Sequence, residues 1–151
     1  MRRMTDERGT PPLTQQFYAN WVRNLREAAG YTQQALAKKM GVHRSFVSHI
    51  ESGKRVISVD TIGQFRLALI VGETEKPPYR QRVAARLQTA RLKISPRLSQ
   101  EALSEMAGCS VGYVAKVENA SVSTTVARLE RLASSLKIEI SELLDDLPQV
   151  K

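Results

Sequence analysis

Apolar side chains recur along this chain at the spacing that is typical of helices with one buried face. The first such stretch predicts a helix that begins near Thr14 or Gln15, because apolar positions repeat at intervals of four, four and three residues. The residues on this predicted buried face are Phe17, Trp21, Leu25 and Ala28. Gly30 is suited to end the helix, since glycine adopts a left-handed backbone at little cost.

Two shorter helices are predicted next, with a glycine between them. Thr32 is a suitable N-cap for the first helix, and Gly41 permits a tight turn after it. The second helix is predicted from about His43 to Glu51, and Ala37 places a small side chain where the two helices approach each other. The apolar positions predicted to face inward are Leu36, Met40, Val42, Val47 and Ile50.

The same pattern returns 67 residues later, and it aligns with residues 32–51 without a gap. Ser99 takes the N-cap position, Ser104 the small position and Gly108 the turn. The last helix of this second copy is predicted to cover about Ser110–Glu118. The predicted inward positions are Leu103, Ala107, Cys109, Val114 and Val117.

Apolar residues after each copy predict two closing helices per repeat. In the first repeat they are Val59, Ile62, Phe65, Leu69 and Ile70. In the second they are Val126, Leu129, Leu132, Ala133, Leu136, Ile138, Ile140, Leu143 and Leu144. No segment alternates convincingly with the period of a strand. The predicted fold class is therefore all-α, with two five-helix domains in tandem.

The chain is predicted to divide into four parts. Residues 1–13 carry charges and no apolar periodicity, so we expect a flexible arm or, alternatively, a basic arm that touches phosphate. Residues 14–72 and 82–147 are the two predicted domains. Residues 73–81 are the predicted linker, because their adjacent prolines favour an extended, semi-rigid geometry.

The helix predicted to open the second domain contains Val83, Leu87, Ala90 and Arg91. Leu87 aligns with Leu25 at an offset of 62 residues, whereas the pattern that follows aligns at 67. We therefore expect a five-residue insertion, Lys93–Arg97, between the first and second helices of this domain.

Composition and charge narrow the setting and the partner. Hydrophobic residues make up 42% of the chain, and no apolar run approaches the roughly 20 residues that span a membrane. The basic start lacks the apolar segment of a signal peptide, and the single cysteine cannot form an internal disulfide, so we expect a cytoplasmic protein. The net charge of +8 favours a polyanionic partner. Residues 1–72 carry +6 and residues 73–99 carry +5, whereas residues 100–151 carry −3.

Together these features resemble the phage repressor and Cro family of helix-turn-helix proteins (lambda repressor-like, xenobiotic-response-element type). The similar segments of the first repeat are Leu25–Ala28, Thr32–Ala37, Gly41–Val42 and Ile50–Gly53. Those of the second are residues 98–103, Val117–Asn119, Leu129–Ala133 and Ile140–Leu144. The resemblance implies a regulator of transcription, most often a repressor, that binds double-stranded DNA as a homodimer on near-palindromic operators. We accordingly expect it at the nucleoid.

The resemblance also implies which residues of the first repeat contact DNA. Thr32 and Gln33, at the start of the second helix, are expected at a phosphate. The third helix is expected to read base edges through His43, Arg44, Ser45, Ser48 and His49. Arg44 is the best of these candidates, because its guanidinium can bridge two acceptors on guanine. Lys54 and Arg55 in the following loop suit phosphate contacts.

The second repeat has weaker chemistry on the matching surface. Its candidate DNA-binding residues are Ser99, Gln100, Ser110, Val111 and Lys116. Gly112 is expected inside the third helix, where glycine costs about 1 kcal/mol relative to alanine. Two interpretations stay open: a second half-site reader, or a domain altered for dimerisation or for binding a protein partner.

A structural ion pair is also implied by the resemblance, between an arginine of the first helix and the glutamate that ends the third. Arg26 and Glu51 match these positions in the first repeat. In the second repeat the glutamate is retained as Glu118, but Gln88 takes the arginine position, unless Arg86 or Arg91 substitutes.

No residue pattern has the spacing of a catalytic triad, a metal site or a phosphate-binding loop, so we expect no enzymatic activity, metal or cofactor. Two other functions stay open. One is an antitoxin or antirepressor whose second domain binds a protein partner. The other is a nonspecific nucleoid or plasmid-maintenance protein. No membrane association is expected.

Overall fold

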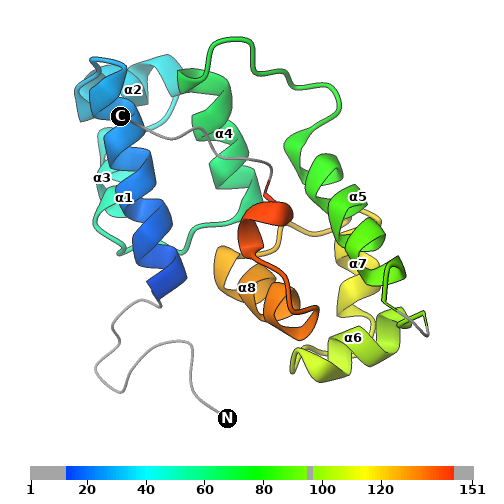
Figure 1. The fold of residues 1–151 in the computed structure, drawn as a ribbon. Helices are drawn as coiled ribbons and strands as arrows, with labels where there is room; N and C mark the ends of the chain where they lie inside the picture. Colours follow the sequence, from blue (N-terminus) through cyan, green and yellow to red (C-terminus); the bar gives the residue numbers. More distant parts are fainter. Residues whose placement is uncertain (1–12, 95–96, 145–151) are drawn as a thin grey trace. The chain divides into compact units, whose positions relative to one another are not determined.

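The computed structural model describes residues 13–94 and 97–144, and these ranges contain eight α-helices, one 3-10 helix and no strand (Figure 1). The chain divides into two compact units, the first unit up to Glu73 and the second unit from Thr74 onward. The prediction of an all-α fold is confirmed. The expected N-terminal arm lies outside the described residues, except for Leu13, which is helical. Among the described helices, none combines the length and apolar character of a membrane span.

The first unit contains four helices within its described residues. They are α1 (Leu13–Ala28), α2 (Gln33–Met40), α3 (Arg44–Glu51) and α4 (Val59–Leu69). One closing helix therefore occupies the segment where two were predicted. Ile70 has an extended backbone, with φ −103° and ψ 122°, which ends α4 and leaves no room for a further turn before Gly72.

The second unit repeats this order with shorter elements. They are α5 (Tyr79–Leu92), α6 (Gln100–Met106), α7 (Tyr113–Glu118), α8 (Val126–Ser135) and the 3-10 helix η1 (Ile140–Glu142). α5 begins inside the segment predicted as linker, because Tyr79 is buried and its hydroxyl donates to the Leu144 carbonyl oxygen at 2.5 Å. The second closing helix is only the short η1.

The buried face of α1 differs from the predicted one. Tyr18, Val22 and Leu25 are buried together with Trp21, whereas Phe17 is 60% exposed and Ala28 is also exposed. The spacing of three and four residues was read correctly, but the stripe is rotated by about one residue around the helix. The inward positions Met40, Val42 and Cys109 are half-buried rather than fully enclosed.

The two opening helices correspond at an offset of 65 residues, not 62. The buried α5 positions Val83, Ala84, Leu87 and Arg91 occupy the places of Tyr18, Ala19, Val22 and Arg26. Loop contacts agree, since Gln15 donates to the Gly53 carbonyl oxygen and Arg80 donates to that of Ala120. The predicted five-residue insertion is therefore wrong, and only two extra residues separate the first and second helices of the second unit.

Candidate nucleic-acid interface

The turn between α2 and α3 is built by local backbone chemistry. Thr32 caps α2 by accepting a hydrogen bond from the Ala35 backbone N–H at 3.0 Å. Gly41 then takes a left-handed conformation with φ 71°, which an L-residue adopts only at a cost. Ala37 is fully buried, so α2 and α3 can approach closely. α3 consequently leaves the turn with Val47 facing the core and the opposite side of the helix outward.

The outward side of α3 carries the candidate base-reading residues. Arg44 and His49 are exposed, and Ser45 and Ser48 are half-buried. His43 is exposed but is held by α3 itself, because its Nδ1 accepts from the Ser45 backbone N–H at 3.1 Å and lies 2.7 Å from the Ser45 hydroxyl. His43 is thus the N-cap of the helix that carries Arg44.

The loop after α3 presents Lys54 and Arg55 to solvent. It is fixed from the first helix, since Gln15 Nε2 donates to the Gly53 carbonyl oxygen at 3.1 Å. The Arg55 guanidinium lies 4.9 Å from the ring centroid of Phe46. That ring is half-buried and stacks on Phe65, with 6.2 Å between centroids. The position of the Arg55 charge beside α3 is therefore set by packing.

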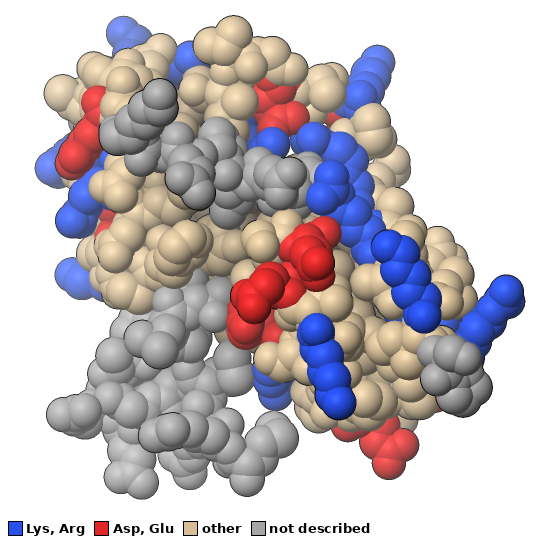
Figure 2. Space-filling model, viewed as in Figure 1, with Lys and Arg blue, Asp and Glu red and all other residues tan. Residues whose placement is uncertain are grey.

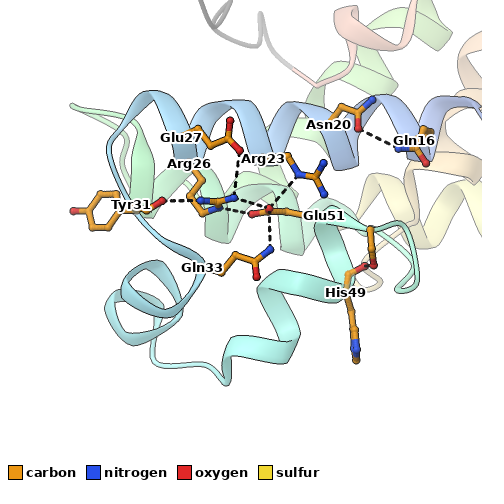
Figure 3. Close-up of polar contacts among 10 residues, drawn as sticks. Gln16, Asn20, Arg23, Arg26, Glu27, Tyr31, Gln33, His49 and Glu51 are labelled. Carbon is orange, nitrogen blue, oxygen red and sulfur yellow. Dashed lines mark hydrogen bonds and ion pairs between the residues drawn. The ribbon is translucent and has the colours of Figure 1, made fainter.

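A buried carboxylate joins the three helices of this site (Figure 3). The Glu51 side chain has no exposed surface, and Arg26 binds it through two nitrogens at 2.6 and 2.9 Å. Gln33 Nε2 donates to Glu51 Oε1 at 3.2 Å, and Arg23 Nε lies 3.5 Å from the same oxygen. Arg26 also donates to the Tyr31 carbonyl oxygen at 2.7 Å. The structure thus brings together the two residues of the expected ion pair and adds Gln33 and Arg23 to them.

The protonation of this cluster follows from its contacts. Burial raises the pKa of Glu51, but hydrogen bonds from Arg26 and Gln33, with the charge of Arg26 and a contact from Arg23, outweigh burial and lower it overall. The hydrogen bond to Glu51 raises the pKa of Arg26. The pair is therefore ionised at neutral pH.

The second unit contains the same pair with a different arginine. Arg91 binds Glu118 at 2.6 and 2.9 Å and donates to the Leu98 carbonyl oxygen at 2.7 Å. Gln100 Nε2 donates to Glu118 Oε1 at 3.0 Å. Gln88 is exposed, and at the offset of 65 it corresponds to Arg23 and not to Arg26. The hydrogen bond to Glu118 raises the pKa of Arg91.

The recognition surface of the second unit departs from the prediction. α7 begins only at Tyr113, whereas a helix from about Ser110 was expected. Gly112 is the N-cap, with φ 81° and no side-chain cap, so it stands outside the helix and the expected interior cost does not apply. Val111 stands where the first unit has Arg44 and is 93% exposed. Ser110 and Lys116 are also exposed, and Ser99 caps α6 through the Ala102 backbone N–H.

Charge is distributed unevenly over the second unit. Figure 2 shows basic side chains along α5 and acidic ones over the segment that carries η1. The basic residues of α5 are Arg80, Arg82, Arg86 and Arg91, and Lys93 follows them. The described residues contain no group of three side chains that could hold a metal ion.

Comparison with known proteins identifies the family. A family model described as helix-turn-helix matches residues 22–75 and again residues 88–143. The chain belongs to the helix-turn-helix family. The tandem arrangement and the resemblance to phage repressors and Cro are thereby confirmed. The protein is a sequence-specific DNA-binding regulator of transcription, and the antitoxin or antirepressor alternative is not favoured.

Two solved structures are similar to parts of this helix-turn-helix protein. The restriction-modification controller protein C.AhdI from Aeromonas hydrophila is 31% identical over 42% of this chain and 94% of its own, with a TM-score of 0.40. The hypothetical transcription factor NHTF from Neisseria is 28% identical over 46% of this chain and 75% of its own, with a TM-score of 0.41. No curated protein matches the sequence.

Sequence reasoning missed Arg23. The available signal was its spacing from Arg26, since residues three apart share one face of a helix. It also placed Gly112 in a helix, although glycine beside an exposed valine is typical of a left-handed helix start only once the fold is known.

Proposed function

We propose that this protein is a repressor that places α3 of the first unit in the major groove of an operator, where Arg44 reads guanine. The observation that carries this proposal is the two-sided character of α3. Val47 and Ile50 are fully buried, whereas Arg44, one turn before them, is exposed at the start of the helix. A helix fits the major groove, and bidentate contacts from arginine to guanine are the commonest specific contacts there.

Phosphate contacts on both sides of α3 support the same placement. Thr32 and Gln33 stand at the start of α2, and Lys54 and Arg55 follow α3. The Gln33 amide nitrogen carries two hydrogens, of which Glu51 takes one, so the other is available to a phosphate oxygen. Such contacts fix the register of the protein on the duplex without reading sequence.

In this proposal the second unit does not read bases. α7 starts two residues later than α3 does, and Val111 replaces the charged side chain of Arg44. Glu101, in the first turn of α6, also places a negative charge where the first unit has neutral Gln34. Each chain then reads one half-site, and two chains occupy a near-palindromic operator as a homodimer. The protein acts in the cytoplasm at the nucleoid, and no catalytic step is assigned to it.

Selection of genomic DNA fragments by the full chain tests the proposal. Wild type should enrich one sharp motif, and Arg44→Ala should lose about 1–3 kcal/mol of discrimination at a G·C pair of that motif. Lys116→Ala, the matched change on α7, should leave the motif intact. An unenriched pool, or a motif indifferent to Arg44, would overturn the assignment. A motif altered by Lys116→Ala would show that the second unit reads bases.

A further inference from the structure

We infer that Arg23, on α1, is a phosphate contact of the first unit, beside Gln33. This inference rests on the proposed function, and it adds a residue to the DNA-contacting set that neither the sequence pattern nor the family resemblance supplied. It follows from three observations: surplus charge, orientation, and the comparison that the second unit provides.

The charge of Arg23 exceeds what Glu51 needs. Arg26 already neutralises this carboxylate through two short hydrogen bonds of 2.6 and 2.9 Å. Arg23 approaches only through Nε, at the longer distance of 3.5 Å, and 46% of its side chain is exposed. Its two terminal nitrogens have no hydrogen-bond partner among the described residues. A cation remains at the surface with its donors unused.

Arg23 is also held in a defined place. Arg23 Nε and Gln33 Nε2 both lie within 3.5 Å of one atom, Glu51 Oε1. Figure 3 shows the Arg23 guanidinium and the Gln33 amide on either side of that carboxylate. Arg23 is thus oriented next to the residue proposed to bind phosphate, and two donors from different helices converge on one patch. Guanidinium groups bind phosphate strongly, through charge-assisted hydrogen bonds.

The second unit separates a structural role from a functional one. It keeps the pair of Arg91 and Glu118 and the bond from Gln100 with nearly the same distances, yet Gln88 stands in place of Arg23. The cluster therefore forms without a second arginine. Arg23 is not needed to hold the three helices together, and its charge is left for a ligand.

The test uses Arg23→Gln, which gives the first unit the residue found at the matching position of the second. The matched control is Lys39→Gln, which removes the same charge elsewhere on this unit. Lys39 lies over the Tyr31 ring, at 5.0 Å from its centroid, and Figure 3 shows that ring pointing away from Glu51. Binding of the full chain to the selected operator and to a random duplex is measured by fluorescence anisotropy at several salt concentrations.

The plot of log affinity against log salt should become shallower by about 0.9 for Arg23→Gln on both duplexes, as for one lost phosphate contact. This corresponds to about fivefold weaker binding at about 0.15 M salt, with the ratio of operator to random binding unchanged. An unchanged slope, an equal effect of Lys39→Gln, or a changed ratio would overturn the inference. The random duplex keeps this test separate from the proposed function, which fails instead if wild type does not prefer the operator.

Thermal unfolding guards against a trivial explanation. Because the second unit tolerates glutamine at this position, Arg23→Gln should unfold within about 2 °C of wild type, the range of a surface change of about 0.5 kcal/mol. A larger fall would assign Arg23 to the structure and overturn its role at phosphate.

Discussion

Glu51→Gln removes the charge at the centre of the first unit while keeping nearly the same shape. The lost interactions can be counted: two short bonds from Arg26, whose side chain is only 11% exposed, and one bond from Gln33. Removing one partner of a buried pair costs about 3–5 kcal/mol, because the other charge stays buried without compensation. Glutamine retains one acceptor oxygen, so we expect the low end, about 3 kcal/mol.

A loss of this size is large for a unit of this length. A domain of 60–100 residues loses about 4–8 °C of melting temperature per kcal/mol, so the first unit should melt about 12–24 °C lower. Trp21 reports this change selectively, because it is the single tryptophan of the chain and is buried in the first unit. The assay is Trp21 fluorescence during heating of the full chain, and Glu118→Gln in the second unit is the matched variant.

Glu118→Gln should leave the Trp21 transition in place and should lower the stability seen by circular dichroism at 222 nm. If Glu51→Gln moves the Trp21 midpoint by less than about 4 °C, which is about 1 kcal/mol, the pair contributes little and the reasoning is refuted.

Acid applies a related perturbation without mutation. The net effect of folding is to lower the pKa of Glu51, so its stabilising contribution is complete above the unfolded value near 4.5 and is lost as pH falls through the lower folded value. The wild-type Trp21 midpoint should therefore fall more steeply than that of Glu51→Gln below about pH 4.5. Parallel curves would contradict this attribution.

Two further predictions concern helix and loop ends. His43→Ala should cost about 0.5–2 kcal/mol in the Trp21 transition, because α3 loses its N-cap, whereas His43→Ser should restore the cap; equal losses would show that the ring does not cap. Ala120 has φ 60° where the first unit has Gly53, so Ala120→Gly should stabilise the second unit by about 0.5–1 kcal/mol, seen by circular dichroism, while Gly53→Ala should destabilise the first; a destabilising Ala120→Gly would mean that the methyl group packs usefully.

The sequence by itself determined the features that depend on neighbouring residues. The repeat at 67 residues, the left-handed turns at Gly41 and Gly108, and the caps at Thr32 and Ser99 all follow from local backbone chemistry. A helix period and a capping hydroxyl act within a few residues, so their effects can be read along the chain. The all-α fold and the two tandem units follow from the same signals.

Tertiary structure decided what depends on residues far apart in the chain. The rotation of α1 was set by which side chains fill the core, so Tyr18 is buried and Phe17 is not. The choice of Arg91 over Gln88 was set by the position of Glu118, 27 residues later. These outcomes compare packings of similar local propensity, and only the assembled core distinguishes their energies. The same holds for Arg23, whose surplus charge becomes evident only beside Glu51.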